Sequence, residues 1–340
     1  MTKPLILSAP EPRSLDLIFT SPARDVLHAT YDVREVQPDQ IATLPADVLY
    51  QVRYIIGQPA LSLETVRQME NLRCIFNVES NLINNMPYDH LFEHGIHVVT
   101  TGAVFAEPVA EMGLAMALCL ARDVVRADTA FQEGRELWGG ESNGSARLLS
   151  GSNVGIIGFG DLGKALARVL QGFRAQISAF DPWLPPSMLR EAGVEPASLN
   201  DVLSNSDTVF VVASVTAENR GFLNADAFAK MRKGAQFILL SRADIVDFDD
   251  LMAAVKSGHI LAASDVFPQE PVPQDHEVRG LENFLRSAHR AGALDSAFKA
   301  MGNMVLEDLR LLDQGLPPMR CKRAERETVS RMRSRPSEIN

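Results

Sequence analysis

Residues 153–181 read NVGIIGFGDLGKALARVLQGFRAQISAFD, and this stretch decides the fold. An apolar strand-like run, NVGIIG, leads into a turn with three glycines. A helical pattern, DLGKALARVLQGF, follows, and a second strand-like run, AQISAF, ends at Asp181. Strand, helix and strand within about thirty residues are typical of a βαβ unit with parallel strands. The stretch therefore predicts a doubly wound α/β sheet.

The turn carries the glycine pattern of a dinucleotide site. Gly158, Gly160 and Gly163 hold the three positions of GxGxxG in GFGDLG. The first glycine permits the tight bend, the second lets a pyrophosphate approach the backbone, and the third lets the helix pack closely on the strand. The pyrophosphate would lie at the amino terminus of the helix, which Asp161 and Leu162 begin. Because the flanking strand and helix agree with the motif, we expect a dinucleotide rather than an ordinary glycine-rich turn.

Asp181 indicates which dinucleotide is bound. A carboxylate at the end of the second strand can accept hydrogen bonds from both adenosine ribose hydroxyls and would repel a 2′-phosphate. The predicted cofactor is therefore NAD rather than NADP, although Asp181 could also be a simple turn residue before Pro182. Thr216, which follows the strand-like run at 208–213, completes the expected cofactor-binding set.

Apolar runs on both sides of this stretch extend the pattern. Those after it lie at 208–213, 237–240, 260–263 and 284–285, and those before it at 5–8, 52–56 and 74–77. The later runs lengthen the doubly wound sheet, whereas the earlier ones predict a smaller α/β unit. Residues 107–128, EPVAEMGLAMALCLARDVVRAD, predict one long buried helix, and a loop rich in Gly and Ser follows at 139–152.

Composition excludes several classes of protein. The chain has 340 residues, 46% of them hydrophobic, which is enough for two cores. Its net charge of -10 argues against nucleic-acid binding, which needs clustered Lys and Arg. Its three cysteines lack metal or disulfide spacing, so we expect no metal and a reducing, cytoplasmic compartment. The longest apolar stretch, 109–125, carries three charged residues, so no membrane span is expected.

Three of the later runs end in reactive side chains: FILLS leads into Arg242, ILAAS into Asp265 and FLRSA into His289. Ligands of an open parallel sheet bind beyond the carboxyl ends of its strands, so these side chains should converge. Arginine binds a carboxylate bidentately and polarises a neighbouring ketone, and histidine exchanges a proton near neutral pH. Glu270, in SDVFPQEP, would orient the imidazole and favour its protonated form.

Together these residues predict hydride transfer between a nicotinamide and a small 2-oxo or 2-hydroxy acid. Each of these residues also has a purely structural interpretation. Arg242 could cap the end of a strand, Glu270 could be a surface acid between prolines, and His289 could be a histidine whose hydrogen bonds are all made within the fold. Their order behind a glycine fingerprint favours the chemical reading.

Five ordered segments between Leu72 and Gly292 resemble the D-isomer-specific 2-hydroxyacid dehydrogenases, which include glyoxylate and hydroxypyruvate reductases and phosphoglycerate dehydrogenases. The segments are VAEMGLAMALCLAR, VGIIGFGDLG, SRADIVD, DVFPQEP and SAHRAG. The resemblance implies that the family's catalytic Arg, Glu and His fall on Arg242, Glu270 and His289, with Asp265 near the nicotinamide carboxamide. It also implies D stereochemistry and a homodimer.

The resemblance further implies a substrate domain made from the amino-terminal third plus the final helix. We therefore expect a Rossmann domain at 102–290, inserted into a smaller flavodoxin-like α/β substrate domain at 1–101 plus 291–316. Residues 317–340 hold seven Lys or Arg against three Glu and few apolar residues, so a basic, mobile tail is expected there.

The chain departs from the family pattern around the expected site. Members have a glycine-rich loop whose backbone binds the substrate carboxylate, where this chain has Val78, Glu79 and Ser80. The Glu79 carboxylate either repels an anionic substrate or points to solvent while the backbone still binds. The usual Asn and Gly around the catalytic Arg, and Thr-Pro before the His, are also replaced, and Ser214 stands where members have proline.

Two rival functions remain open at this stage. A formate dehydrogenase is disfavoured because that subfamily pairs its His with Gln, whereas this chain has Glu270. An NAD-binding regulator, similar to the corepressors of this fold, is kept open by the departures and disfavoured by the retained catalytic set. Arg290, next to His289, could bind a second anionic group of a dicarboxylate or phosphorylated substrate.

Overall fold

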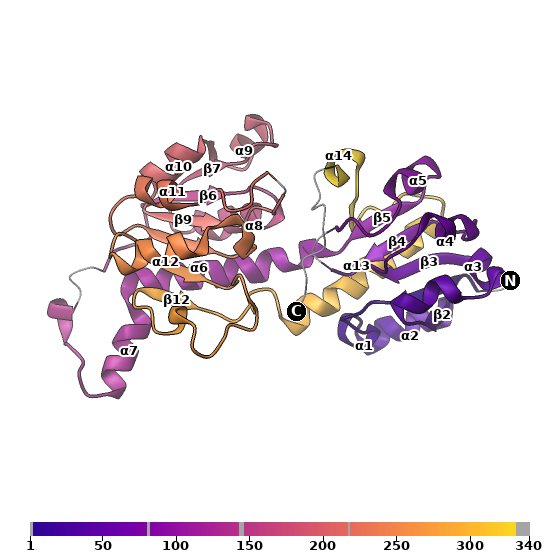
Figure 1. Cartoon of the computed structure of the whole chain (residues 1–340), viewed down its shortest axis with the longest axis horizontal. Helices are drawn as coiled ribbons and strands as arrows, with labels where there is room; N and C mark the ends of the chain where they lie inside the picture. Colours follow the sequence, from indigo (N-terminus) through magenta and orange to yellow (C-terminus); the bar gives the residue numbers. More distant parts are fainter. Residues whose placement is uncertain (1–2, 80–81, 143–145, 217, 331–340) are drawn as a thin grey trace. The chain divides into compact units, whose positions relative to one another are not determined.

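The computed structural model describes residues 3–79, 82–142, 146–216 and 218–330. The chain divides into two compact units. Unit 1 holds the described residues up to Phe105 and from Ala293 onward, and unit 2 holds Ala106–Gly292. Each unit contains one sheet flanked by helices, so each is an α/β unit (Figure 1).

Unit 2 is built on a seven-stranded sheet in which each strand pairs in parallel with its neighbours. The strand order is β12-β11-β10-β9-β6-β7-β8. Counted from β6, this is the Rossmann order 3-2-1-4-5-6 with one further strand, so the expected doubly wound sheet is confirmed. The strands are β6 (Asn153–Ile157), β7 (Gln176–Phe180), β8 (Glu195–Pro196), β9 (Thr208–Val211), β10 (Gln236–Leu239), β11 (Leu261–Ser264) and β12 (Phe284–Arg286).

Alternating side chains give the strands of unit 2 two buried faces. Val209, Val211 and Phe237 pack with α10, α11 and α12 in one core. On the opposite side of β9, Phe210 approaches Gly113 of α6. Helix α6 packs on α8, β10 and β11. The helices are α6 (Ala106–Arg122), α7 (Val124–Gln132), α8 (Asp161–Gln171), α9 (Pro186–Glu191), α10 (Leu199–Asn205), α11 (Ala225–Lys230) and α12 (Phe248–Lys256), with short 3-10 turns η3 (Gly139–Ser142), η4 (Ala243–Ile245) and η5 (Glu277–Arg279).

The single long helix expected at 107–128 is wrong. It breaks at Asp123, whose φ of 55° lies in the left-handed region, and α7 starts at the next residue. Aspartate tolerates this conformation better than most residues, and here its carboxylate also pairs with Arg126 of α7. The break sends α7 away from the rest of unit 2 (Figure 1).

Residues Gly102–Arg122 are long and apolar enough to cross a membrane by length and composition alone, with 33% of that window buried. The core helix of a soluble domain passes the same test. Because α6 packs against a helix and two strands of unit 2, its apolar character is explained by this core.

Unit 1 is built on a six-stranded sheet with the order β13-β5-β4-β3-β1-β2. The order 2-1-3-4-5 of its parallel strands is flavodoxin-like, as expected, and β13 pairs antiparallel to β5 at the edge. The strands are β1 (Leu5–Ala9), β2 (Asp32–Glu35), β3 (Val52–Gly57), β4 (Cys74–Asn77), β5 (His97–Thr100) and β13 (Lys322–Arg323).

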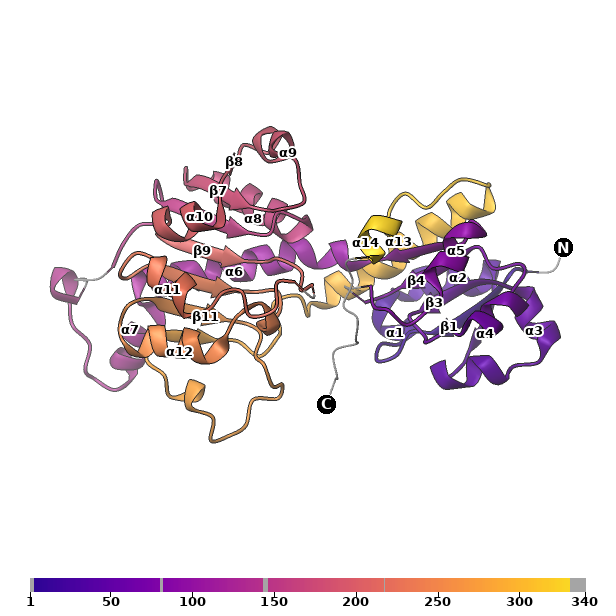
Figure 2. The same cartoon turned by 45° about the horizontal axis from the view of Figure 1, so that its top comes forward.

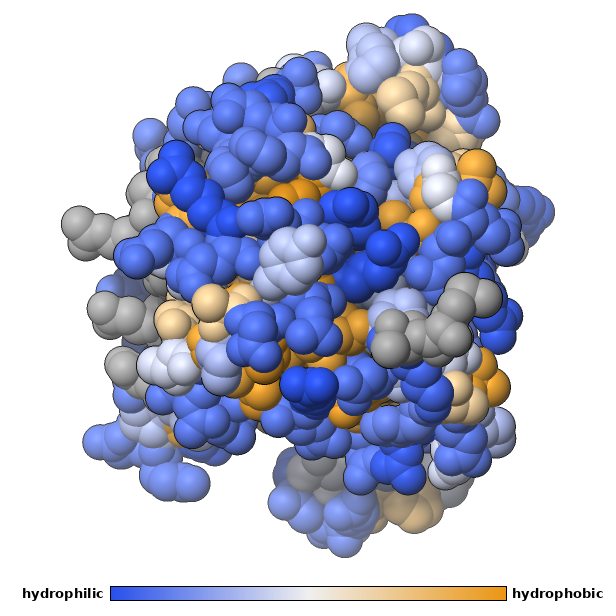
Figure 3. All heavy atoms as spheres, turned by 90° about the vertical axis from the view of Figure 1, so that its right-hand side faces the viewer, coloured by the Kyte–Doolittle hydropathy of each residue, from blue (hydrophilic) through white to orange (hydrophobic). Residues whose placement is uncertain are grey.

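Two cores cover the faces of this sheet. Helices α1, α2 and α13, which are labelled in Figure 2, belong to unit 1. They pack over Ile6, Tyr54 and Phe76, and the opposite core contains Leu7 and Ile55. The surface seen in Figure 3 is mostly hydrophilic, with small apolar patches between polar side chains. The helices are α1 (Leu15–Ile18), α2 (Ser21–Thr30), α3 (Ala46–Gln51), α4 (Leu63–Gln68), α5 (Tyr88–Glu93), α13 (Asp295–Asp313) and α14 (Arg326–Val329), with 3-10 turns η1 (Pro38–Thr43) and η2 (Gly102–Phe105).

The expected mobile tail at 317–340 is wrong for residues 317–330. Cys321 and Ala324 are 4% and 5% exposed, and each enters one of the two cores of unit 1. The buried carboxylate of Asp308, in α13, accepts the backbone N–H groups of residues 319, 320 and 321 at 2.7–2.9 Å. This segment therefore forms part of unit 1, and residues 331–340 lie outside the described residues.

Candidate active site

The three glycines of the fingerprint turn have distinct local geometry. Gly158 has a φ of +93°, and a Cβ there would lie 2.4 Å from Cα of Ala213. A Cβ on Gly163 would lie 2.3 Å from the carbonyl oxygen of Gly158, so this glycine permits helix α8 to pack on the end of β6. These two positions therefore require glycine for the turn itself.

Gly160 differs because a Cβ there would meet nothing within 4 Å. Gly160 is also the N-cap of α8, and it supplies no side-chain hydrogen bond to the first turn, which Asp161 and Leu162 begin. The space in front of a helix amino terminus that no side chain caps suits an anionic group, because the backbone N–H groups point into this space. The turn therefore fits the pyrophosphate of a dinucleotide.

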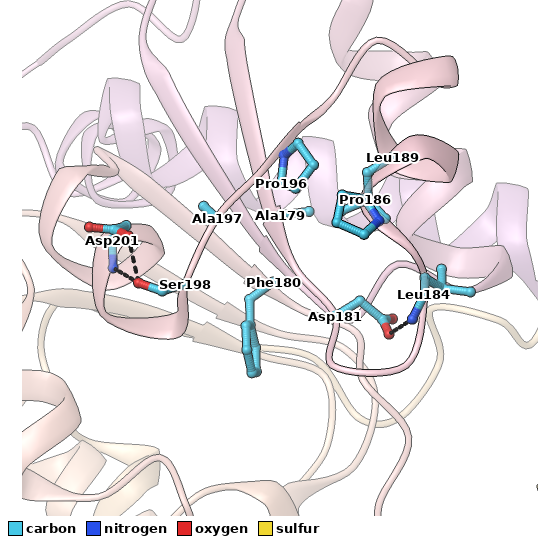
Figure 4. Close-up of a pocket in the computed structure, with 10 residues that line it drawn as sticks. All are labelled: Ala179, Phe180, Asp181, Leu184, Pro186, Leu189, Pro196, Ala197, Ser198 and Asp201. Atoms are coloured by element: carbon cyan, nitrogen blue, oxygen red, sulfur yellow. Dashed lines mark hydrogen bonds between the residues drawn. The ribbon is translucent and has the colours of Figure 1, made fainter.

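Asp181 lies where β7 ends, on the edge of a cavity of about 300 Å³ (Figure 4). Its Oδ2 accepts the N–H of Phe159 at 2.8 Å, and its Oδ1 accepts the N–H groups of Trp183 and Leu184 at 3.0 and 3.1 Å. Asp181 is therefore more than a turn residue, since it ties the fingerprint turn to the loop after β7. Seven of the ten residues that line the cavity are apolar, with Phe180 and Leu189 among them.

His289 and Glu270 lie in contact, from loops that follow β12 and β11. Nδ1 of His289 is 2.6 Å from Oε2 of Glu270, and the N–H of Phe267 donates to Oε1 at 2.8 Å. Burial alone raises the pKa of the Glu270 carboxyl. Hydrogen bonds from His289 and Phe267, with the charges of His289 and Arg242, outweigh burial and bring this pKa below its ordinary value. Glu270 is therefore a carboxylate at neutral pH.

Asp265 fixes the backbone that carries His289. Its carboxylate is 1% exposed and accepts the N–H groups of Arg290 and Ala291 at 3.0 Å each, while its carbonyl oxygen accepts the N–H of His289 at 2.7 Å. His289 has a φ of +49°, a conformation that costs about 1 kcal/mol or more for a residue other than glycine. Asp265 thus stabilises a strained loop that aims the imidazole.

Arg242 follows β10 and is half-buried, with extended backbone. Its Nη1 donates to the carbonyl oxygen of Ser241 at 2.7 Å, and its charge lowers the pKa of Glu270. The guanidinium is therefore close enough to act electrostatically on the pair formed by Glu270 and His289. All three expected catalytic residues come from carboxyl ends of neighbouring strands in the same sheet.

Three buried hydroxyl oxygens at this edge of the sheet have no hydrogen-bond partner among the described residues: Thr216 Oγ1, Ser241 Oγ and Ser287 Oγ. They follow β9, β10 and β12 respectively. Buried hydroxyls without partners are unfavourable, so a group that binds here would gain by pairing with them. This observation and the open space at Gly160 both fit a dinucleotide extended along the carboxyl ends of the strands.

In unit 1, the expected substrate loop follows β4. Glu79 does not reach freely into solvent, because its Oε2 pairs with Nη2 of Arg13 at 3.0 Å and its side chain is 31% exposed. The N–H of Glu79 donates to Oδ1 of Asn77 at 2.7 Å, which closes a tight turn around the buried Val78. Ser80 lies outside the described residues.

Arg13 and the positioning contacts of Asp265 are absent from the sequence-based expectations. Arg13 follows β1, 66 residues before Glu79, and no local pattern links the two. Arg290 is exposed and its backbone N–H is held by Asp265. Among the residues that the structure describes, no group of three His, Cys, Asp or Glu is placed to hold a metal ion.

Comparison with known families agrees with this geometry. The profile of the D-isomer-specific 2-hydroxyacid dehydrogenases, NAD-binding domain, matches residues 114–291, which is more than half of the chain. The chain belongs to this family. It is therefore an oxidoreductase of a soluble, NAD-binding enzyme family that acts on CH–OH donors.

Individual members of the 2-hydroxyacid dehydrogenase family show how far the similarity extends. Glyoxylate reductase of Korarchaeum cryptofilum is 32% identical over 240 residues, which cover 69% of this chain and 72% of that protein. D-3-phosphoglycerate dehydrogenase of Mycobacterium leprae is 30% identical over 300 residues, 87% of this chain and only 56% of that protein. A crystal structure described as a phosphoglycerate oxidoreductase from Rhizobium etli is 69% identical, with a TM-score of 0.91, and covers 96% of this chain and 100% of that one.

Proposed function

We propose that this dehydrogenase interconverts a small 2-oxo acid and the corresponding D-2-hydroxy acid with NAD(H). The observation that carries the proposal is the 2.6 Å contact between His289 and Glu270. A histidine paired with an ionised carboxylate is a proton donor and acceptor held in one orientation. Its place in the sheet that holds the fingerprint turn supports hydride chemistry rather than hydrolysis. We assign cofactor binding to unit 2 and substrate binding to unit 1.

In this mechanism, bound NAD(H) supplies or accepts the hydride. The Nδ1–H group of His289 donates to Glu270, so the transferable proton resides on Nε2. During reduction Nε2 gives its proton to the ketone oxygen as that oxygen gains charge, and Glu270 stabilises the imidazolium beforehand. Arg242 binds the carboxylate of the substrate and polarises the ketone. Asp265 contributes by holding the His289 loop.

We further propose NAD rather than NADP as the cofactor. The loop at 181–185, DPWLP, contains no Lys or Arg to bind a 2′-phosphate, and Asp181 at its start carries a negative charge. Three backbone N–H groups already fix this carboxylate, so it has little freedom to turn away from a phosphate. Repulsion by a fixed carboxylate is a strong selector against the phosphorylated dinucleotide.

The direct test follows nicotinamide absorbance during incubation with glyoxylate, hydroxypyruvate, pyruvate, 2-oxoglutarate and phenylpyruvate, each with NADH and with NADPH. We expect turnover of at least one small 2-oxo acid and a lower KM for NADH than for NADPH. Tight NADH binding without turnover of any of these acids would contradict the proposed reaction. Equal KM values for the two dinucleotides would contradict the cofactor assignment.

Replacing Glu270 with glutamine should change the pH dependence of both directions. Glu270 is ionised down to pH values below the ordinary range of a glutamate, so its negative charge faces the ring of His289 throughout the neutral range. Reduction needs the protonated imidazole. Without the charge of Glu270, the loss of reduction activity on the alkaline side of the pH profile should therefore begin at a lower pH than in the wild type. Oxidation, which needs the neutral imidazole, should retain activity to a lower pH. Profiles of kcat/KM measured in both directions would test this, and unchanged profiles would remove Glu270 from the proton relay.

We also propose a homodimer, based on the arm formed by α7 and the residues on either side of Gly139. This arm exposes large apolar side chains, with Phe131 61% and Trp138 75% exposed. Apolar side chains concentrated on one segment are typical of a covered surface, and a two-fold axis would let two copies cover each other. Light scattering should give twice the chain mass, and Trp138→Glu should reduce it to that of one chain. A monomeric wild-type protein would refute the arrangement.

A further inference from the structure

We propose that His90 and His94, at the end of helix α5 in unit 1, form a binding site for a divalent transition-metal ion, with Cu²⁺ bound most tightly. The site has two imidazole ligands and takes its other ligands from water. It belongs to unit 1 alone, and the inference does not depend on the proposed function. The spacing of the cysteines, which disfavours a cysteine-bound metal, has no bearing on this pair of histidines.

The end of α5 fixes the spacing of the two histidines. The N–H of His94 donates to the carbonyl oxygen of His90 at 3.1 Å, as in a regular helical turn. Gly95, with a φ of +66°, ends the helix, and the N–H of Ile96 donates back to the carbonyl oxygen of Leu91 at 2.8 Å. Residues four apart on a helix share one face, so the two imidazoles project from the same side of α5.

The neighbours of α5 cover its other faces. Leu91 is buried in one core of unit 1, and the ring of Phe92 lies 5.4 Å from Cζ of Arg326 in α14, the helix beside α5 (Figure 1). On the remaining face His90 is partly exposed and His94 is exposed. An ion can therefore reach this face from solvent, and water can occupy the coordination positions that the protein does not fill.

The two imidazole rings lie side by side. Their centroids are 3.9 Å apart, and their planes are inclined by 34°. A metal ion at about 2.0–2.1 Å from two imidazole nitrogens holds those nitrogens roughly 3 Å apart. Because the ring centroids are separated by little more than this distance, small rotations of the side chains bring both nitrogens to one ion. Binding therefore costs little side-chain entropy.

A hydrogen bond determines which nitrogen of His94 faces the metal. Nδ1 of His94 lies 2.9 Å from the carbonyl oxygen of His90. Because a carbonyl oxygen only accepts, Nδ1 carries the hydrogen of this bond, and Nε2 of the neutral ring keeps its lone pair. Metal-binding histidines commonly donate their second nitrogen to a backbone carbonyl in this way, which fixes the tautomer and the orientation of the ring. His94 therefore presents Nε2 as a ligand.

The surroundings of His90 favour its neutral form. Burial, a protonated His94 and the charge of Arg67, in that order, lower the pKa of His90, and Glu93 opposes them. A neutral imidazole has the lone pair that a metal ion needs. The carboxylate of Glu93 attracts a cation and the guanidinium of Arg67 repels it, so these two charges largely offset each other. The affinity of the site therefore comes from the two imidazoles.

Imidazole ligands also determine which ions bind. The affinity of nitrogen ligands for divalent ions increases from Mn²⁺ through Co²⁺ and Ni²⁺ to Cu²⁺ and is lower for Zn²⁺. Mg²⁺ and Ca²⁺ prefer oxygen ligands. We therefore expect Cu²⁺ to bind more tightly than Ni²⁺ or Zn²⁺, and an excess of Mg²⁺ should not displace it.

The experiment titrates the full-length chain, produced without a histidine tag, with Cu²⁺ and follows binding by calorimetry and by electron paramagnetic resonance. The wild type should bind one Cu²⁺ ion tightly, with a spectrum that shows coupling to two imidazole nitrogens. His90→Gln and His94→Gln should each weaken binding by about 10²-fold, because a linked pair of ligands is reduced to one. Each variant should also lose the coupling to two nitrogens.

His28→Gln is the matched control, because His28 is an exposed histidine on α2 with no second histidine one turn away, and it should leave affinity and spectrum unchanged. A wild-type spectrum without two nitrogens, or an affinity that neither His90→Gln nor His94→Gln lowers, would overturn the inference. A test without substitutions uses Zn²⁺, which should slow amide exchange at residues 94–96 of the wild type by about tenfold or more. Unchanged exchange at these residues in saturating Zn²⁺ would also overturn it.

Discussion

Replacing His289 with glutamine is expected to lower kcat for 2-oxo acid reduction by about 10³-fold, within the range of 10²–10⁴ typical of a positioned acid or base. Glutamine can still donate a hydrogen bond toward Glu270, so the local packing is kept. It cannot transfer a proton near neutral pH, however, and the charge that develops on the ketone oxygen is left without a donor. NADH affinity should change by less than threefold, because the fingerprint turn and Asp181 are untouched.

The readouts for this variant are single-turnover reduction, which isolates the chemical step, and NADH binding by fluorescence. The matched control is His28→Gln, since His28 is an exposed histidine on α2 of unit 1 and should leave kcat unchanged. Loss of NADH binding together with kcat would indicate that His289 supports the fold of the loop rather than the chemistry. A kcat within tenfold of the wild type would remove His289 from the role of acid and base.

The parts of the fold that could be predicted from sequence are those with strong local patterns. The runs at 74–77 and 284–285 fall in strands, and the glycine fingerprint falls at the turn between β6 and α8 of unit 2. Strand β2 was missed because three of the four residues of DVRE are charged and because it lies at a sheet edge, where only one side is paired. The helix break at Asp123 has no glycine or proline to signal it.

In the site, too, contacts signalled by local pattern were predicted and contacts between distant residues were not. The chemistry of the side chains and their places at strand ends predicted that Glu270 and His289 meet, and the catalytic roles of both residues stay predictions. The sequence raised the possibility that Glu79 repels an anionic substrate, but it gave no sign that Arg13 neutralises Glu79 from 66 residues away. Such a pairing depends on β1 and β4 lying in one sheet with β3 between them. Contacts between distant residues arise from the topology, so a single sequence read by local pattern does not contain them.

The carboxyl-terminal segment illustrates this limit and leads to a second large effect. Residues 317–330 look like a solvated tail because most of them are polar. Cys321 and Ala324 nevertheless occupy core positions on the two faces of unit 1, and Val329 packs against one of these cores. The feature that fixes them is one acid, Asp308, in an amphipathic helix where acids usually face solvent. Asp308 is instead fully buried, and its carboxylate receives three backbone N–H groups.

Asp308→Ala is expected to destabilise unit 1 by about 3–5 kcal/mol, because it removes the acceptor for several charge-assisted hydrogen bonds and leaves a cavity. For a unit of this size, that loss corresponds to a fall in its Tm of about 10 °C. The buried N–H of Cys321 loses its partner outright, whereas residues 319 and 320 are exposed and can turn to water. Asp308→Asn keeps the shape and one acceptor oxygen, but its amide N–H groups face other donors, so it should lose about half as much.

Calorimetry and amide hydrogen exchange together distinguish this role from a general loss of packing. The transition of unit 1 should move while that of unit 2 stays in place, and exchange at residues 319–324 should accelerate before the rest of the sheet. Asp25→Ala, which removes an exposed carboxylate from α2, should leave both transitions unchanged. If Asp308→Ala melts like the wild type, the packing of the segment's apolar side chains is enough to hold it, and β13 forms without a hydrogen bond to this carboxylate. If exchange accelerates evenly across unit 1, the carboxylate stabilises the whole core rather than docking this segment onto it.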